Sequence, residues 1–183
     1  MEVTNTMFTT GYVIGMIGIA LCVLLCGVGS AIGLYKTGSA AAGVLGENPK
    51  LFGKVMVLVL LPATQGIYGF IIAIIASGQL STLTGAIEAV EGAGGMAAQG
   101  WAIFGAVLPM TVSGLVTGYF QGKAAVNCIY AVGKQESLGG KLILYPAMIE
   151  FYAILGLLIS IILVSAVPVL GYVPVVTPVA SVL

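Results

Sequence analysis

Four long apolar stretches dominate the pattern of hydrophobic and polar positions along the chain. A helix needs roughly 20 apolar residues to cross about 30 Å of hydrocarbon, and each of these stretches is long enough. The pattern therefore predicts an all-α membrane protein with four transmembrane helices. They are expected from about Gly11 to the mid-40s, from about Phe52 to Ala76, from about Gly100 to Tyr130 and from about Leu142 to Ala166.

Composition supports this class and excludes others. The chain is 60% hydrophobic and 7% charged, too few charges to cover the surface of a soluble domain. It contains no His, Asp or Arg and no G-x-x-x-x-G-K-[ST] phosphate loop, so acid–base, transition-metal and nucleotide chemistry lack their usual residues. We expect no catalytic residue in the isolated chain, no organic cofactor and no nucleic-acid partner.

The charged residues orient the helices. All six lysines fall in or beside the loops that join the first helix to the second and the third to the fourth, whereas Glu2, Glu88 and Glu91 lie on the opposite side. Lysine-rich loops face the cytoplasm. The sequence therefore predicts cytoplasmic loops and two external termini, in the plasma membrane of a prokaryote. The lysines are Lys36, Lys50, Lys54, Lys123, Lys134 and Lys141.

The chain also repeats itself at an offset of 84 positions. Pro62-Ala63 matches Pro146-Ala147 (146 − 62 = 84), and the same offset pairs Tyr68 with Tyr152. Two tandem helical hairpins of one kind are predicted, in residues 1–80 and 98–167. Glu150 then corresponds to Gly66 (150 − 84 = 66), so the first hairpin lacks the carboxylate of the second.

Glycines divide the helices into two classes. Gly114, Gly118 and Gly122 recur every four residues in the third helix, and the first helix is equally glycine-rich. Glycines four apart line one face and let helix backbones approach closely. We expect the first and third helices to pack tightly together, with the second and fourth outside, although generic small-residue contacts would leave the same pattern. The apolar tail 168–183 contains three prolines and is expected to be irregular.

Glu150 is the chief candidate for chemistry because it lies eight residues after the predicted start of the fourth helix (150 − 142 = 8). A carboxylate at such depth is costly unless a proton, a cation or an ion pair neutralises it. No lysine lies at comparable depth. The interpretation as an ion site therefore competes only with that of a protonated structural carboxyl.

The second helix offers partners for this carboxylate. Leu61, Thr64, Gln65 and Tyr68 share one helix face, and Pro62 disturbs the backbone beside them. Gln121 of the third helix adds an amide, which could also serve only as interhelical glue. One carboxylate, two amide oxygens and hydroxyls suit a hard cation such as Na⁺. A proton would need only the carboxylate, and it stays the alternative.

These motifs resemble those of a known family. Residues 61–69 (LPATQGIYG), 121–123 (QGK) and 150–156 (EFYAILG) are similar to the proteolipid subunit, called K or c, of V-type and A/V-type ATPases, and closest to its sodium-pumping branch. The resemblance covers about residues 11–166. It implies that Na⁺ is held by the backbone oxygen of Leu61 and by Thr64, Gln65, Gln121 and Glu150. It also implies that Tyr68 hydrogen-bonds the carboxylate.

The resemblance further implies an assembly and a mechanism. Identical chains would form a membrane rotor ring that turns against a stator subunit bearing an arginine, while central-stalk subunits dock on the lysine-rich loops. Each chain would carry its ion as a neutral pair, and ATP would be hydrolysed by other subunits. A four-helix channel is the rival hypothesis, but a channel would line an aqueous path with several polar positions per helix. Here the polar groups converge at one place.

Overall fold

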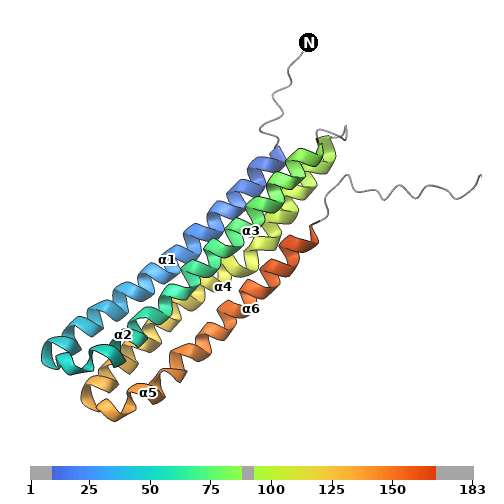
Figure 1. Ribbon diagram of the computed structural model, residues 1–183. Coiled ribbons are helices and arrows are strands. Elements are labelled where there is room, and N and C mark those ends of the chain that lie inside the picture. The colour runs from blue at the N-terminus through green and yellow to red at the C-terminus, as the bar shows by residue number, and fades with distance from the viewer. Residues whose placement is uncertain (1–9, 88–92, 168–183) are drawn as a thin grey trace, which may run out of the picture.

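The computed structural model describes residues 10–87 and 93–167, with 83–87 and 93–97 described as helical backbone alone. Four helical spans run side by side along one long bundle (Figure 1). No strand occurs among the described residues. The elements are α1 (Thr10–Glu47), η2 (Pro49–Leu51), α2 (Phe52–Leu60), η3 (Leu61–Ala63), α3 (Thr64–Ile87), α4 (Ala93–Lys134), η4 (Glu136–Leu138), α5 (Gly139–Leu142) and α6 (Leu144–Ala166).

The predicted fold class is confirmed. Four helices are long and apolar enough to cross a membrane: Thr10–Glu47, Pro49–Thr82, Ala98–Lys134 and Glu136–Ala166. Two helices extend beyond their predicted ends, since α3 continues past Ala76 to Ile87 and α4 begins at Ala93, before Gly100. A fall in hydropathy marks the edge of the hydrocarbon, whereas a helix can continue beyond it into water. The apolar pattern therefore underestimates helix length.

Glycine contacts confirm the close packing of α1 against α4. A Cβ on Gly29 would lie 2.7 Å from the carbonyl oxygen of Gly114, and one on Gly118 would lie 2.7 Å from the carbonyl carbon of Gly29. Any larger side chain would force the two backbones apart. In contrast, α6 exposes a large apolar surface, since Tyr152 and Ile162 are 67% and 60% exposed. The glycine-rich pair α1 and α4 thus forms the tight centre of the chain.

The span that contains η3 is interrupted at Pro62, as its sequence predicts. Pro62 has no N–H and sits in the 3-10 turn Leu61–Ala63 between α2 and α3. Side chains of α1 bond to the backbone around this turn. Ser30 Oγ accepts a hydrogen bond from the Gly66 N–H at 2.7 Å, and Thr37 Oγ1 donates one to the Val59 carbonyl at 3.2 Å. The turn is therefore held in place by α1.

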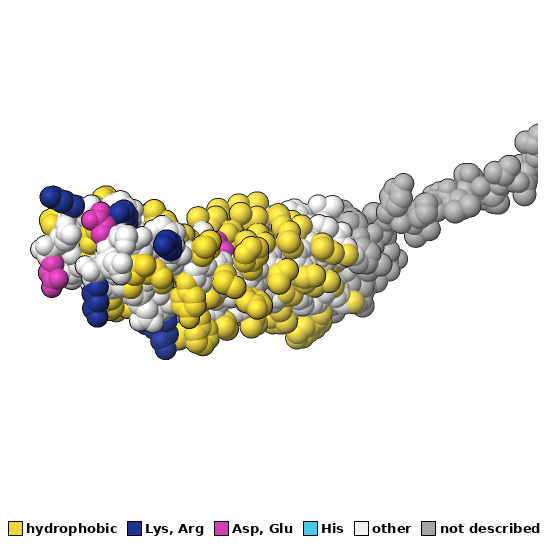
Figure 2. Space-filling view, turned by 90° about the horizontal axis from the view of Figure 1, so that it is seen from below, with side chains coloured by type: hydrophobic (Ala, Val, Ile, Leu, Met, Phe, Trp, Pro, Cys, Tyr) yellow, Lys and Arg dark blue, Asp and Glu magenta, His cyan; other side chains and the backbone are white. Residues whose placement is uncertain are grey.

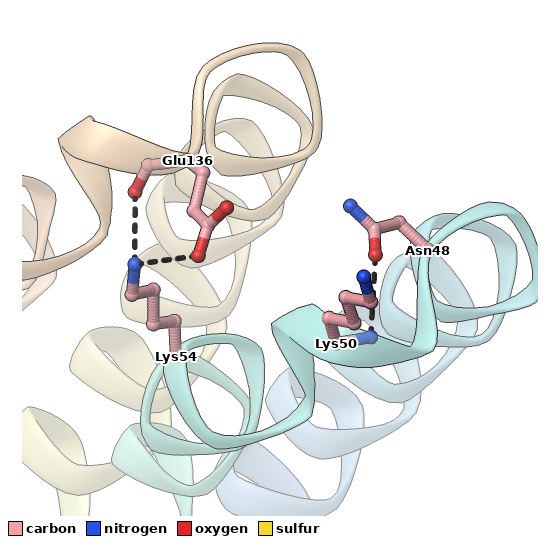
Figure 3. Close-up of polar contacts among 4 residues, drawn as sticks. All are labelled: Asn48, Lys50, Lys54 and Glu136. Atoms are coloured by element: carbon pink, nitrogen blue, oxygen red, sulfur yellow. Dashed lines mark hydrogen bonds and ion pairs between the residues drawn. The ribbon is translucent and has the colours of Figure 1, made fainter.

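Charge gathers at one end of the bundle. In Figure 2 the lysine side chains lie near the end that carries the α1–α2 and α4–α6 loops, and apolar side chains cover most of the rest of that face. Figure 3 shows Lys54 of α2 bonded to Glu136 of η4, with Nζ 2.9 Å from Oε1. Asn48 Oδ1 accepts from the Lys50 N–H at 3.2 Å and caps η2 (Figure 3). The exposed Lys54–Glu136 pair joins the two loops and adds little stability.

Some of the predicted features lie outside the described residues. The tail 168–183 is one of them, and Glu2, Glu88 and Glu91 are others. Residues 1–9 lie outside them as well, so the exact hairpin bounds 1–80 and 98–167 stay a prediction, as does the external position of the termini.

Candidate ion-binding site

Glu150 lies half-buried on α6, facing α3 and α4. Its neighbours Met148 and Phe151 point outward and are each 66% exposed. Glu150 Oε1 accepts a hydrogen bond from the Tyr68 hydroxyl of α3 at 2.6 Å. Its Oε2 accepts one from the Gln121 Nε2 of α4 at 3.2 Å. Side chains from three helices therefore meet at this carboxyl group.

Gln121 connects the carboxylate to the second span. Its Nε2 also donates to the carbonyl of Pro146 at 3.2 Å, one turn before Glu150 on α6. Its Oε1 accepts a hydrogen bond of 2.5 Å from Gln65 Nε2. Both glutamines are fully buried. A continuous network thus runs from Gln65 through Gln121 and Glu150 to Tyr68.

The network contains an amide oxygen that lacks a partner. Gln65 Oε1 is buried and has no hydrogen-bond partner among the described residues, although a buried polar atom costs about 1–3 kcal/mol when it is left unsatisfied. An amide oxygen accepts only, so a donor or a cation satisfies it. A cation bound beside Gln65 would use this atom.

The 3-10 turn places two more oxygens next to Gln65 in the chain. Thr64 Oγ1 donates to the Leu61 carbonyl at 3.0 Å, and the Thr64 N–H bonds to the same carbonyl. In a regular α-helix that carbonyl would bond to the N–H of Gln65, four residues later. The turn at Pro62 therefore changes how the Leu61 oxygen is used.

The structure brings together four of the six predicted residues by direct hydrogen bonds: Glu150, Gln121, Gln65 and Tyr68. The other two, Thr64 and Leu61, bond to each other beside Gln65. The sequence did not reveal that the Pro146 carbonyl would share the Gln121 amide, because backbone acceptors leave no residue pattern.

The role of Ser30 was also not predicted from the sequence. This residue lies opposite Gly66, the position that corresponds to Glu150, and a Cβ on Gly66 would come 3.2 Å from Ser30 Oγ. Ser30 Oγ also donates to the Ala63 carbonyl at 3.4 Å. In the first hairpin a serine hydroxyl therefore occupies the region that corresponds to the carboxylate of the second hairpin. A lone serine in a glycine-rich helix gives no signal of this role.

The groups around Glu150 limit the kind of ion that the site can bind. Within the described ranges, Lys54–Glu136 is the salt bridge that forms, and no cluster of three His, Cys, Asp or Glu side chains is found there. The carboxylate is therefore met by hydroxyl and amide groups rather than by a lysine. Such oxygen-rich surroundings suit a proton or a hard cation and not a transition metal.

Fold and site together define a class: an integral membrane protein of paired helical hairpins with a carboxyl group held between helices. Comparison with known proteins identifies the family. The sequence model of the family described as the C subunit of ATP synthase matches residues 17–76 and 104–163, one match in each hairpin. The chain belongs to this family, and the two matches confirm the internal duplication.

Individual relatives agree with this assignment. The V-type sodium ATPase subunit K of Enterococcus hirae is 38% identical over 84% of this chain and 92% of its own length. The A-type ATP synthase subunit K of Methanocaldococcus jannaschii is 36% identical over 85% of this chain and 63% of its length. The c'' subunit of the V-type proton ATPase of Saccharomyces cerevisiae is 27% identical over 85% of this chain and 71% of its own length.

The resemblance stated from the motifs is thereby confirmed. By family, the chain is a non-catalytic proteolipid subunit and an integral membrane protein. The relatives include one named for sodium and one named for protons, so family membership alone does not select the ion.

Proposed function

We propose that this chain is the rotor-ring subunit of a V-type or A-type ATPase, and that it binds one Na⁺ at Glu150 and carries it across the membrane. The observation that carries the sodium assignment is the buried Gln65 Oε1, which has no hydrogen-bond partner in the part of the chain that the structure describes. A proton on Glu150 would leave this oxygen unused. A sodium ion would take it as a ligand, because Na⁺ is a hard cation that prefers oxygen.

The proposed ligands are the Glu150 carboxylate, the side-chain oxygens of Gln65, Gln121 and Thr64, and the Leu61 carbonyl. That carbonyl accepts from both the N–H and the hydroxyl of Thr64, so the hydroxyl would turn away from it to free one lone pair for the ion. Gln121 Oε1 already accepts from Gln65 Nε2, but an amide oxygen has two lone pairs and keeps one for a cation. Tyr68 stays outside the ligand set. Its hydroxyl donates to Glu150 Oε1 and fixes the carboxylate in place.

Neutral carriage follows from the depth of Glu150. A bare carboxylate that faces lipid is penalised by several kcal/mol, and a bound Na⁺ cancels its charge. The ring would turn with each carboxylate occupied until a stator subunit offers an arginine, whose positive charge displaces the ion. ATP is hydrolysed in other subunits of the complex.

The chain carries one carboxylate at mid-membrane depth for four helices, because Gly66 stands at the position that corresponds to Glu150. A ring of such chains carries fewer ions per turn than a ring with a carboxylate in every hairpin. Each ATP then drives fewer ions, each against a steeper gradient, and 100 mV alone opposes each charge by about 2.3 kcal/mol. This ratio favours pumping over ATP synthesis.

We assign the remaining partners to the two surfaces of the ring. Central-stalk subunits dock on the lysine-rich loops, which place both termini outside a prokaryotic plasma membrane. Neighbouring copies and lipid cover the apolar sides, where residues such as Phe70 and Leu155 are more than half exposed.

Proton transport by the same kind of ring is the second candidate. The hydrogen bonds from Tyr68 and Gln121 already accommodate the Glu150 carboxyl, and the yeast relative is named for a proton ATPase. A titration of Na⁺ binding separates the two candidates.

Radioactive ²²Na⁺ binding to the purified ring tests the proposal. We expect one Na⁺ per chain, and none in Glu150→Gln because the variant removes the negative charge. Glu136→Gln is the matched control, since Glu136 lies in the exposed loop pair, and it should bind as the wild type does. A wild-type ring that binds no Na⁺ at any pH would overturn the sodium assignment and leave the proton as the candidate.

A further inference from the structure

A second polar cluster lies on the face of α4 turned away from Glu150. Lys123 follows Gln121 by two residues, which turns it about 200° around the helix. Its Nζ lies 5.4 Å from the centre of the Tyr119 ring, and the Nζ of Lys36 from α1 lies 3.8 Å from the same centre. Two ammonium groups therefore share one aromatic ring.

These lysines border a pocket of about 460 Å³ between α1 and α4. Ser39 Oγ is already bonded to the Tyr35 carbonyl at 2.8 Å, whereas the Asn127 amide and the lysine ammonium groups can donate into the pocket. Every side chain that lines it is neutral or positive. The lining residues are Tyr35, Lys36, Ser39, Ala40, Lys123, Val126, Asn127 and Tyr130.

Among the described residues, the two positive charges lack an acidic partner. The ion pair found in this part of the chain is the Lys54–Glu136 bridge, and Glu150 bonds to Tyr68 and Gln121 on the other side of α4. The Tyr119 ring attracts each ammonium group, but it does not cancel the repulsion between them. An anion in the pocket would, and its negative charge fits the lining.

The position of the cluster along the helices indicates which anion this is. Lys36 precedes the end of α1 at Glu47 by eleven residues, and Lys123 precedes the end of α4 at Lys134 by the same number, which is about 16 Å along each helix. About two turns further from these ends both helices expose apolar side chains, with Val28 and Val116 46% and 44% exposed. The pocket therefore lies on the boundary between a polar and an apolar surface.

Lysines and tyrosines at such a boundary are typical of the headgroup level of a membrane, and basic pockets between transmembrane helices bind anionic headgroups. We propose that Lys36, Lys123 and Tyr119 form a binding site for the phosphate group of an anionic phospholipid. The acyl chains follow the apolar surface at Val28 and Val116. This site is separate from the carboxylate network and does not rest on the proposed function.

Native mass spectrometry of the purified full-length assembly tests the proposal, with phosphatidylglycerol as the probe and phosphatidylcholine of the same chain length for comparison. We expect phosphatidylglycerol to be retained at least tenfold more tightly. The double variant Lys36→Gln/Lys123→Gln should lose this preference, and Lys36→Arg/Lys123→Arg should keep it. The matched control is Lys50→Gln/Lys141→Gln, which removes two loop lysines and should behave as the wild type does.

Two results would overturn the assignment. Equal retention of phosphatidylglycerol by the wild type and the Lys36→Gln/Lys123→Gln variant would show that these lysines bind no headgroup. Displacement of the lipid by millimolar inorganic phosphate would show a site for the free ion instead. Retained assembly and an unchanged thermal unfolding temperature, followed by circular dichroism, would establish that the double variant is folded.

Discussion

At the residue scale, the two ends of the Gln65 amide have different surroundings. Nε2 bonds to Gln121 at 2.5 Å, whereas Oε1 is buried without a hydrogen-bond partner in residues 10–87 and 93–167. The first contact fixes the side chain, so the oxygen is held ready without any further loss of rotamer freedom. Such preorganisation strengthens the binding of a cation.

Replacing Gln65 should therefore weaken sodium binding without preventing assembly. In Gln65→Ala we expect the Kd for Na⁺ to rise at least tenfold, about 1.4 kcal/mol, because a ligand is lost, while removal of the unsatisfied oxygen limits the loss of stability. Equilibrium ²²Na⁺ binding measures the effect. Gln79→Ala is the control, since Gln79 lies on the same helix and bonds to the Val167 carbonyl. An unchanged Kd would remove Gln65 from the ligand set.

Tyr68 should act through its hydroxyl alone. A hydrogen bond to a charged group contributes about 1.5–3 kcal/mol, so Tyr68→Phe should weaken Na⁺ binding at least about tenfold while the ring of the side chain still packs. Tyr152 is the matched control, because the repeat equates it with Tyr68 and its side chain is 67% exposed on α6. If Tyr152→Phe weakened binding as strongly as Tyr68→Phe, the assigned role would be wrong.

At the scale of the elements, α1 contacts both α4 and the turn at Pro62, the two parts of the chain that position the site residues. Its glycines bring it against α4, which carries Gln121, and its Ser30 and Thr37 bond to the backbone around the turn at Pro62. Lipid offers no hydrophobic drive for helix association. The positions of Gln65 and Gln121 therefore depend on close backbone packing.

Gly29 tests this dependence. A Cβ there would lie 2.7 Å from the carbonyl oxygens of Gly114 and Leu115, so Gly29→Ala should lower the thermal unfolding temperature of the detergent-purified protein, followed by circular dichroism. Gly27→Ala is the control on the same helix, because a Cβ at Gly27 meets nothing within 4 Å. It should be neutral or slightly stabilising, since alanine favours helix over glycine by about 1 kcal/mol. Equal effects of the two substitutions would contradict tight α1–α4 packing.

Much of this was predictable from the sequence. The length of the apolar runs gives four spans, the glycine spacing gives the α1–α4 contact, and Pro62 gives the break. The ends of α3 and α4 were misjudged because polar residues can continue a helix outside the hydrocarbon. The bond from Gln121 to the Pro146 carbonyl and the role of Ser30 depend on how helices cross, which no local pattern records.

At the scale of the whole molecule, two similar hairpins have become unequal. The second keeps Glu150, and the first has Gly66 with Ser30 Oγ directly against it. Restoring a side chain at Gly66 would require Ser30 to move. The duplicated fold thus supports one carboxylate site, and under the proposed function the number of ions moved per turn would equal the number of chains in the ring.

The central claim is that Na⁺ occupies the site at Glu150, and carbodiimide labelling of the intact ring tests it most directly. A carbodiimide reacts with the protonated carboxyl group, so a bound Na⁺ protects Glu150. At fixed pH we predict that millimolar Na⁺ slows labelling of Glu150, that K⁺ at the same ionic strength protects less, and that Gln65→Ala needs more Na⁺ for the same protection. Labelling that proceeds at the same rate with and without Na⁺ would contradict the account.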